Sequence, residues 1–244
     1  MVKFLYYLAA FGEPNTNIKY EILIHNINYI HKNIKTNFDL FVNVYDTTYF
    51  ESIINELNFT YLNKIIINKQ KGILSELWID NPYHDALENY DYIFFILDDV
   101  KIKNIDILSL INIKVNNKID IISPRVKKST WHYMKGGCIS NSISITSRLE
   151  IFCLLLTYID FIKFISMNDT QNSNIWGVDY MFPYYKLKTA ICNKYTVEHV
   201  LKSNSDHVVA IEQMESYIIK HGYTSRDDII REYPNDIIEV ILEI

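Results

Sequence analysis

The chain has few cysteines, and their placement excludes two common uses of this residue. There are three, Cys138, Cys153 and Cys192, and no two of them have CxxC spacing. An odd number without that spacing fits neither a disulfide framework nor a zinc site. We therefore expect a protein of a reducing compartment and predict a cytoplasmic location.

Long uncharged apolar runs are lacking as well. The stretch Ile151–Ile165 is interrupted by Asp160 and Lys163, so it falls short of the roughly 18 uncharged residues that a membrane-spanning helix needs. The amino-terminal apolar run breaks at Gly12 and Pro14, which is too early for a convincing signal sequence. We expect no membrane span, and we interpret the first run as a buried strand.

An excess of positive charge is also absent, because the formal net charge is -5 and the acidic and basic residues are interspersed. Such a surface does not neutralise many phosphates, so we expect no nucleic-acid partner. The sequence contains no Walker-type glycine loop and no HExxH or GxSxG motif. The signatures of common nucleotide hydrolases and serine esterases are therefore missing. With 49% apolar and 22% charged residues, the composition is that of a globular protein.

In the first hundred residues, segments with strand periodicity alternate with segments of helical periodicity. The expected strands are Val2–Ala10, Phe38–Tyr45, Leu62–Asn68 and Tyr90–Leu97, and the expected helices are Asn17–Asn33, Tyr49–Leu57 and Ile73–Glu88. Repetition of this unit predicts an α/β fold with a mostly parallel central sheet and helices on both faces. Such sheets bind ligands beyond the carboxyl ends of their strands.

The second half has a less regular pattern. Strands are expected at Ile119–Ser123, Cys138–Ile145 and Ala190–Val200, and helices at Asp106–Ile113, Arg148–Met167 and His207–Lys220. We predict a catalytic domain over residues 1–206 and a helical C-terminal extension over residues 207–244 that packs on it. A final short helix and an apolar segment are expected after Thr224 and Ser225.

The strongest local signal is the segment IFFILDDV, in which an apolar run ends in two adjacent carboxylates, Asp98 and Asp99. A strand that is buried on both faces presents its last side chains to the ligand crevice, where carboxylates can hold a hard divalent cation. In the alternative interpretation, the two aspartates cap an ordinary turn at the end of a strand and bind no ion.

A second signal is WGVDY, in which aromatic residues flank Asp179. Partial desolvation among rings raises the proton affinity of a carboxylate toward that of a general base. In the alternative interpretation, this segment is a helix N-terminus with Asp179 as an early acidic residue and with Trp176 and Tyr180 in the core.

The alternation of strands and helices, the LDD of Leu97–Asp99 as a degenerate DxD motif, and the later WGVDY as a WGxDY motif together resemble the GT-A glycosyltransferases. The order and spacing are similar to the small glycosyltransferase domains of large DNA viruses, which decorate capsid or fibre glycans. The resemblance covers roughly residues 1 to 200. It implies a donor that is a nucleotide-diphosphate sugar, such as a UDP- or GDP-sugar, and a glycan or glycoprotein acceptor. It also implies a GT-A-like nucleotide-binding fold and a Mn2+ or Mg2+ cofactor. The protein would be a monomer or homodimer, in the host cytoplasm if it is viral.

The resemblance also implies roles for particular residues. Asp99, helped by Asp98, would hold the cation that bridges the donor phosphates, and His199 would complete the metal shell. Asp179 would be the catalytic base of an inverting transfer, or an acceptor-binding carboxylate if the reaction retains configuration. Lys101 stands where a second spaced acid would be, which leaves the number of metal ligands open.

The nucleotide would lie across the ends of the first strands. The residues expected near it are Ala9, Ala10, Phe11, Asp46, Lys71, Gly72, Asp98 and Arg125. Lys71 and Gly72 also fit an ordinary polar turn. The loop with Trp131, His132, Gly136 and Gly137 resembles a mobile flap on the acceptor side.

Two rival functions fit part of the same pattern. A Mg2+-dependent phosphoesterase or phosphotransferase could use Asp98 and Asp99, since a strand that ends in acids also serves those reactions. A non-catalytic nucleotide- or carbohydrate-binding module could stack its tyrosines on sugar rings and hold calcium with the same acids.

Overall fold

The computed structural model describes residues 2–13, 15–45, 59–69, 73–127, 141–201, 206–234 and 237–242. Its strands are β1 Phe4–Phe11, β2 Phe38–Val44, β3 Leu62–Lys69, β4 Tyr92–Ile96, β5 Val100–Asn104, β6 Ile121–Lys127, β7 Ser142–Thr146, β8 Cys153–Leu156, β9 Thr189–His199 and β10 Ile237–Leu242. The helices are α1 Thr16–Ile34, α3 Leu74–Ile79, α4 Ile107–Asn116, α6 Tyr158–Ser166, α7 His207–Lys220 and α8 Arg226–Glu232, and the 3-10 turns are η1 His84–Asn89 and η2 Val178–Tyr180.

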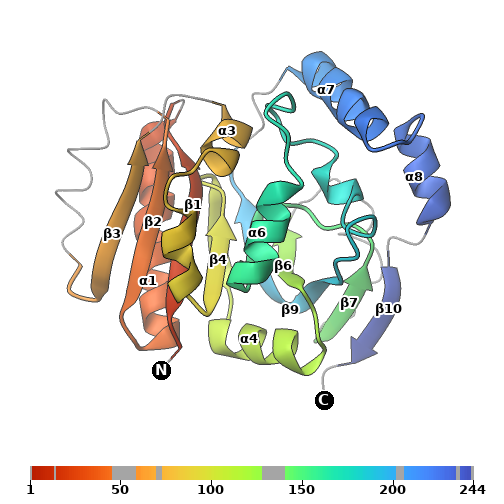
Figure 1. Ribbon diagram of the computed structural model, residues 1–244. Helices are drawn as coiled ribbons and strands as arrows, with labels where there is room; N and C mark the ends of the chain where they lie inside the picture. The colour runs from red at the N-terminus through yellow and green to blue at the C-terminus, as the bar shows by residue number, and fades with distance from the viewer. Residues whose placement is uncertain are drawn as a thin grey trace.

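The strands form one sheet in the order β10-β7-β9-β6-β8-β4-β1-β2-β3, and β5 pairs with β9 outside this path (Figure 1). The strands β1 to β4, β6, β9 and β10 run in one direction, whereas β5, β7 and β8 run in the other. The predicted α/β class with a mostly parallel central sheet is therefore confirmed.

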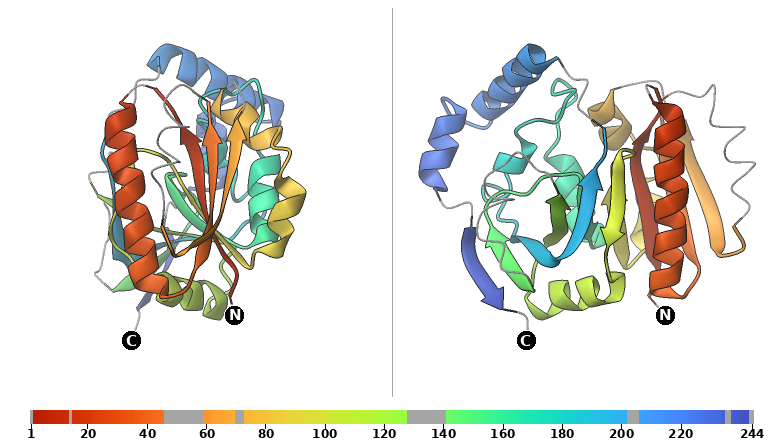
Figure 2. Two further views of the ribbon diagram at one scale, coloured as in Figure 1. Left: turned by 90° about the vertical axis from the view of Figure 1, so that its left-hand side faces the viewer. Right: turned by 180° about the vertical axis from the view of Figure 1, so that it is seen from behind.

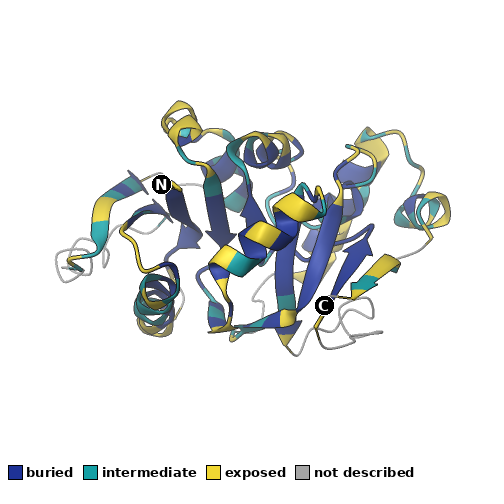
Figure 3. Ribbon diagram, turned by 90° about the horizontal axis from the view of Figure 1, so that it is seen from below, coloured by how far each residue is buried: buried dark blue, intermediate teal, exposed yellow. Residues whose placement is uncertain are grey.

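Helices cover both faces of the sheet, as expected for parallel strands joined by right-handed crossovers. In Figure 2, α1 lies on the face opposite to α3 and α6. Every residue of β1 is buried, and Figure 3 shows buried strands between helices whose outer surfaces are exposed. The amphipathic pattern of α1 explains its place, because Ile22, Leu23, Ile27 and Ile30 recur at helical spacing and are buried against the sheet.

The predicted long helix Arg148–Met167 is wrong. Its first part contains β8, which pairs with β4 and β6, and the helix α6 begins only at Tyr158. A short apolar run fits a buried strand as well as a buried helix, so periodicity alone could not separate them. The helix starts where Thr157 and Asp160 form a capping box with a 2.6 Å side-chain hydrogen bond.

Other boundaries differ from the predictions. The expected helix Ile73–Glu88 is divided into α3 and η1, since Pro82 follows Asn81 between them. The strand expected at Ile119–Ser123 continues to Lys127, so Arg125 lies inside β6 rather than after it. The described part of the strand expected at Cys138–Ile145 is β7. The helix expected at Tyr49–Leu57 lies outside the described residues.

The C-terminal extension contains the expected helices α7 and α8. Its last described segment, β10, is a strand that pairs antiparallel with β7, so the extension is not entirely helical. The domain boundary at residue 206 stays a prediction. In the part of the chain that the structure describes, no helix combines the length and the apolar character needed to span a bilayer.

Candidate active site

The two adjacent aspartates lie in the turn between β4 and β5. The strand β4 ends at Ile96, and β5 runs antiparallel to the end of β9 with Val100 opposite His199. The Val200 amide also donates to the Asp99 carbonyl at 2.9 Å. This register brings the Asp99 carboxylate to the His199 imidazole, and Nε2 lies 2.8 Å from Oδ2.

The helix α1 fixes the strand that follows the aspartates. The side-chain amide of Asn26, fully buried, donates to the Val100 carbonyl at 2.8 Å and accepts from the Ile102 amide at 2.9 Å. Because both ends of one side chain hold β5, the turn that carries Asp99 cannot shift along the helix without losing these bonds.

The surroundings of His199 favour a protonated ring when no cation is present. Burial lowers the pKa of His199, but the hydrogen bond and charge of Asp99, with the charges of Glu150 and Asp98, outweigh burial and raise it. The Phe152 ring stacks on the imidazole with centroids 4.5 Å apart. The second oxygen of Asp99, Oδ1, is buried and has no hydrogen-bond partner among the described residues.

Asp98 faces a different partner. Its Oδ2 lies 2.9 Å from the Lys19 ammonium, and both side chains are buried. Burial raises the pKa of Asp98 to about 7, with a contribution from the charge of Asp99, although the Lys19 charge opposes the shift. The two adjacent carboxylates are thus engaged separately, one by α1 and one by β9.

Lys19 also joins the ends of β1 and β2. Its ammonium donates to the Gly12 carbonyl at 2.8 Å and to the Tyr45 hydroxyl at 3.0 Å, and that hydroxyl donates to the Glu13 carbonyl at 2.7 Å. Gly12 must lack a side chain, because a Cβ there would lie 2.4 Å from the Tyr45 ring. The buried ammonium of Lys19 therefore lies at the ends of β1 and β2, beside the expected donor site.

The residues around Asp99 can be compared with the needs of the divalent cation that the sequence resemblance implies. No group of three or more His, Cys, Asp or Glu side chains among the described residues is arranged to hold a metal ion. Asp99 and His199 supply two adjacent ligand atoms, and Asp99 Oδ1 has unused acceptor capacity. One or two carboxylates together with substrate phosphates are the usual protein coordination of Mg2+ in phosphate-binding sites, and here Asp99 supplies one carboxylate and His199 a nitrogen. The arrangement fits such a cation.

Asp179 lies in the 3-10 turn η2, after Gly177, whose φ of 89° lies in the left-handed region. Burial raises the pKa of Asp179 to about 6, against the charge of Arg148 and backbone hydrogen bonds that lower it. The Arg148 guanidinium also stands 4.6 Å from the centroid of the Tyr180 ring. Asp179 is therefore a carboxylate whose proton affinity is tuned by one buried arginine.

One short segment contacts both parts of the site. Arg148 acts on Asp179, whereas Phe152 stacks on His199 and the charge of Glu150 acts on the same imidazole. Four residues of extended chain span at most about 13 to 14 Å. The loop between β7 and β8 thus links Asp179 to the pair of Asp99 and His199.

The residues expected near the nucleotide have different placements. Ala9, Ala10 and Phe11 end β1 and are buried. The Ala9 carbonyl accepts from Trp78 Nε1 at 2.9 Å and from Asn43 Nδ2 at 3.1 Å, so its hydrogen-bonding capacity is already used. Arg125 is half-buried in β6 and pairs in register with Thr196.

Several expected residues lie outside the described part of the chain. They are Asp46, Lys71 and Gly72 from the nucleotide site and Trp131, His132, Gly136 and Gly137 from the flap.

Sequence reasoning missed Lys19, Asn26, Tyr45, Arg148 and Phe152. A signal existed for the first two, because Lys19 and Asn26 continue the apolar stripe of α1 at helical spacing. Polar residues on a buried stripe need partners, and here those partners are Asp98 and β5. The other three depend on contacts between distant segments that no local pattern encodes.

No protein-family model and no curated protein sequence matches the chain. The fold, in contrast, matches solved structures of GT-A glycosyltransferases. GalNAc-T7, crystallised with UDP, GalNAc and Mn2+, matches the chain with a TM-score of 0.61 and 8% identity. The match covers 90% of this chain and 48% of that chain. For residues 1–349 of S. aureus TarS in complex with UDP-GlcNAc, the TM-score is 0.62, the identity is 12%, and 96% of this chain and 72% of that chain are covered.

A second S. aureus TarS structure has a TM-score of 0.56 and 10% identity, with 93% of this chain and 45% of that chain covered. The chain thus spans about half the length of two of these three structures. At such identities the likeness is one of fold.

Proposed function

We propose that the protein is a metal-dependent glycosyltransferase, which moves a sugar from a nucleotide-diphosphate sugar to an acceptor hydroxyl of a glycan or glycoprotein. The observation that carries this proposal is the 2.8 Å contact between Asp99 and His199 at the carboxyl edge of a GT-A sheet. Two ligand atoms at the ligand-binding edge, one with unused acceptor capacity, suit a cation shared with phosphates.

On the donor side, Asp99 and His199 would hold a Mn2+ or Mg2+ ion. When bound, the ion neutralises the negative charge that develops on the departing diphosphate. To bind the ion through Nε2, His199 would have to lose the proton on that nitrogen. In the present arrangement Nε2 carries this proton and donates a hydrogen bond to the Asp99 carboxylate. Asp98 stays paired with Lys19 and holds α1 against the end of β4.

The donor would lie over the ends of β1 and β2. The neighbour structures support this class of donor, because GalNAc-T7 was crystallised with UDP and TarS with UDP-GlcNAc. A UDP-sugar is the first choice on that basis, and a GDP-sugar is the alternative. Tyr45, held by Lys19 and Glu13, presents a ring at this edge on which a base could stack.

On the acceptor side, Asp179 would take the proton of the attacking hydroxyl. A carboxyl with a pKa of about 6 is ionised at neutral pH and is a stronger base than an ordinary aspartate. Direct attack by a hydroxyl that such a base activates inverts the configuration at the anomeric carbon. The Arg148 charge keeps the carboxylate ionised before the acceptor arrives.

The test is release of nucleoside diphosphate from a panel of UDP- and GDP-sugars, with and without Mn2+ and with glycan acceptors. We expect one donor to be turned over when Mn2+ is present and not when it is absent, and we expect Asp99→Asn to lose that turnover. The matched control is Glu198→Gln, because Glu198 neighbours His199 on β9 and pairs with Lys103 instead. If no donor is turned over, or if Asp99→Asn matches the wild type, the proposal fails. Release of inorganic phosphate instead would favour a phosphoesterase, and binding without turnover a non-catalytic module.

A further inference from the structure

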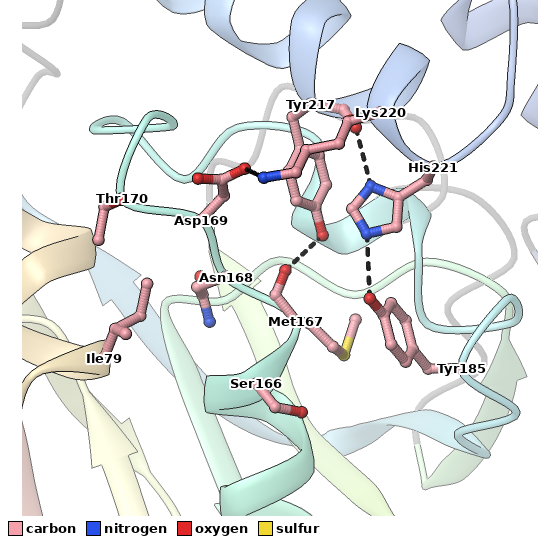
Figure 4. A pocket seen from close by; sticks show the side chains of 10 residues that line it. All are labelled: Ile79, Ser166, Met167, Asn168, Asp169, Thr170, Tyr185, Tyr217, Lys220 and His221. Atoms are coloured by element: carbon pink, nitrogen blue, oxygen red, sulfur yellow. Dashed lines mark hydrogen bonds and ion pairs between the residues drawn. The ribbon is translucent and has the colours of Figure 1, made fainter.

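A polar cavity lies away from the aspartate pair, between the end of α6, the loop after it and the carboxyl end of α7 (Figure 4). Its volume is about 320 Å³. Small-molecule pockets are about 300 to 1,000 Å³, so this cavity suits a ligand of one or two rings. The proposed donor site does not use any of the residues that line it.

An aromatic and histidine network forms one wall of the cavity. His221 Nδ1 lies 2.8 Å from the Tyr217 carbonyl, so this nitrogen must carry the proton. His221 Nε2 lies 3.0 Å from the Tyr185 hydroxyl and, in the neutral ring, accepts from it. This network fixes the Tyr185 hydroxyl and leaves its oxygen able to accept a further hydrogen bond from a ligand.

An ion pair with no net charge lies beside this network, at the same end of α7. Asp169 and Lys220 form an ion pair at 2.5 Å, and they are the only formal anion and cation among the described residues that line the cavity. The Lys220 ammonium has three N–H donors, of which Asp169 uses one. A strongly charged ligand such as a phosphate would meet Asp169 beside that cation.

Asn168 also lines the cavity, but its polar atoms are not open to a ligand. Its side-chain N–H groups donate to the Phe164 and Ile165 carbonyls at 2.8 and 3.2 Å. Its Oδ1 is buried and has no hydrogen-bond partner in the described residues. The cavity therefore combines spare N–H donors on Lys220, an acceptor on the Tyr185 oxygen and tyrosine rings, without net charge. Hydroxyl groups both donate and accept, and sugar rings also have apolar faces that pack on aromatic rings.

The cavity shares a wall with the turn that carries Asp179. Tyr217 donates its hydroxyl to the Met167 carbonyl at 2.6 Å. The same ring packs on Gly177, where a Cβ would lie 3.6 Å from Tyr217 Cδ1. Burial raises the pKa of Tyr217, with smaller contributions from Tyr185, Asp169 and Asp179.

We propose that this cavity binds a neutral sugar residue, held by Tyr185 and Lys220. Its use as a subsite for the acceptor glycan rests on the proposed function, because only then does the nearby Asp179 act on an acceptor. The binding of a neutral saccharide does not depend on catalysis.

The test is saturation-transfer NMR with the full chain and the methyl glycosides of glucose, galactose, mannose, N-acetylglucosamine and N-acetylgalactosamine, followed by calorimetric titration of those that bind. We expect at least one to bind the wild type, and Tyr185→Phe and Lys220→Met each to weaken it by about tenfold. The matched controls are Tyr83→Phe and Lys163→Met, since both residues are exposed and lie outside the cavity. Both should bind like the wild type.

Separate readouts distinguish failure of this proposal from failure of the proposed function. Binding of UDP and GDP with Mn2+, followed by thermal shift, should be unchanged in Tyr185→Phe and Lys220→Met, which also shows that these variants fold. If none of the five glycosides binds, if inorganic phosphate displaces the one that does, or if the two cavity variants bind it like the controls, the saccharide site is wrong. If a glycoside binds there but no nucleotide sugar is turned over, the saccharide site stands and the transferase proposal falls.

Discussion

The Lys19 ammonium lies 2.9 Å from Asp98 Oδ2, and Asp99, the next residue, points instead to His199. The two adjacent carboxylates thus have different partners: Asp98 pairs with the Lys19 ammonium, and Asp99 contacts the His199 imidazole. Lys19 holds the ends of β1, β2 and β4 together through Gly12, Tyr45 and Asp98. This arrangement predicts different consequences for the two aspartates.

Removing the charge of Lys19 should destabilise the fold. Lys19→Met leaves the buried Asp98 carboxyl, whose pKa is already about 7, without its cation, so the loss of unfolding free energy should grow as the pH rises above 7. The double variant Lys19→Met/Asp98→Asn should recover part of this loss, because it no longer buries an unpaired charge. Urea unfolding of the two single variants and the double variant measures the coupling. Additive losses would contradict a direct ion pair.

The pair of Asp99 and His199 should behave differently. His199→Gln keeps hydrogen-bonding capacity but removes the imidazole ligand, so we expect the stabilisation of the protein by UDP or GDP to lose its dependence on Mn2+. Stability without ligand should change little, because the His199 side chain is partly exposed. Thermal shift with and without Mn2+ measures this, and His25→Gln on α1 is the control. Unchanged Mn2+ dependence would remove His199 from the proposed metal site.

The raised pKa of Asp179 predicts the acid limb of the pH profile. The base works only as a carboxylate, so kcat/KM should fall as the pH drops through about 6 and be about tenfold lower at pH 5 than at pH 7. An ordinary aspartate would lose activity only near pH 4. Arg148→Gln should move the limb to higher pH, because the charge of Arg148 lowers the pKa of Asp179.

The control for the pH profile is Lys163→Gln, an exposed change on α6. If Asp179→Asn still transferred sugar at a near-normal rate, or if the limb did not move in Arg148→Gln, Asp179 would not be the base.

Two glycines with similar backbone conformations separate strain from packing. Gly177 and Gly222 have φ values of 89° and 92°, and alanine in this region costs about 1–2 kcal/mol. At Gly177 the new Cβ would also lie 2.8 Å from Met214 Cγ, whereas nothing lies within 4 Å at Gly222. Overpacking adds about 1–3 kcal/mol.

Gly177→Ala should therefore lower the unfolding free energy more than Gly222→Ala. Adding Met214→Ala to Gly177→Ala should remove the part of the loss that comes from overpacking. Urea unfolding measures the two single glycine variants and this double variant. Equal losses at the two glycines would mean that α7 does not pack on the turn of Asp179.

Much of the fold could be predicted from local patterns. The strands β1, β2 and β4 and the helix α1 follow from buried runs and helical spacing, because parallel strands with both faces covered are largely apolar. The segment around Leu154 and Leu155 could not be assigned in the same way. Its burial between β4 and β6 comes from antiparallel pairing with distant strands, and the local sequence fits either a strand or a helix.

The site was predictable where chemistry is concentrated in a motif. The sequence draws attention to Asp98, Asp99 and Asp179 because carboxylates rarely follow apolar runs or stand among rings without a reason. It does not reveal that Lys19 forms an ion pair with Asp98, or that the charge of Arg148 acts on Asp179, since each pair joins elements far apart in the chain. Such partners are set by tertiary packing.

The most direct test of the central claim is the position of the cation. Crystals soaked with Mn2+ and UDP, and in parallel with Mn2+ and GDP, should give an anomalous peak for Mn2+ within bonding distance of Asp99 and His199, with the diphosphate oxygens completing its coordination. Lys19 should remain paired with Asp98. A bound diphosphate without a peak at Asp99, or Mn2+ held elsewhere on the chain, would contradict the account.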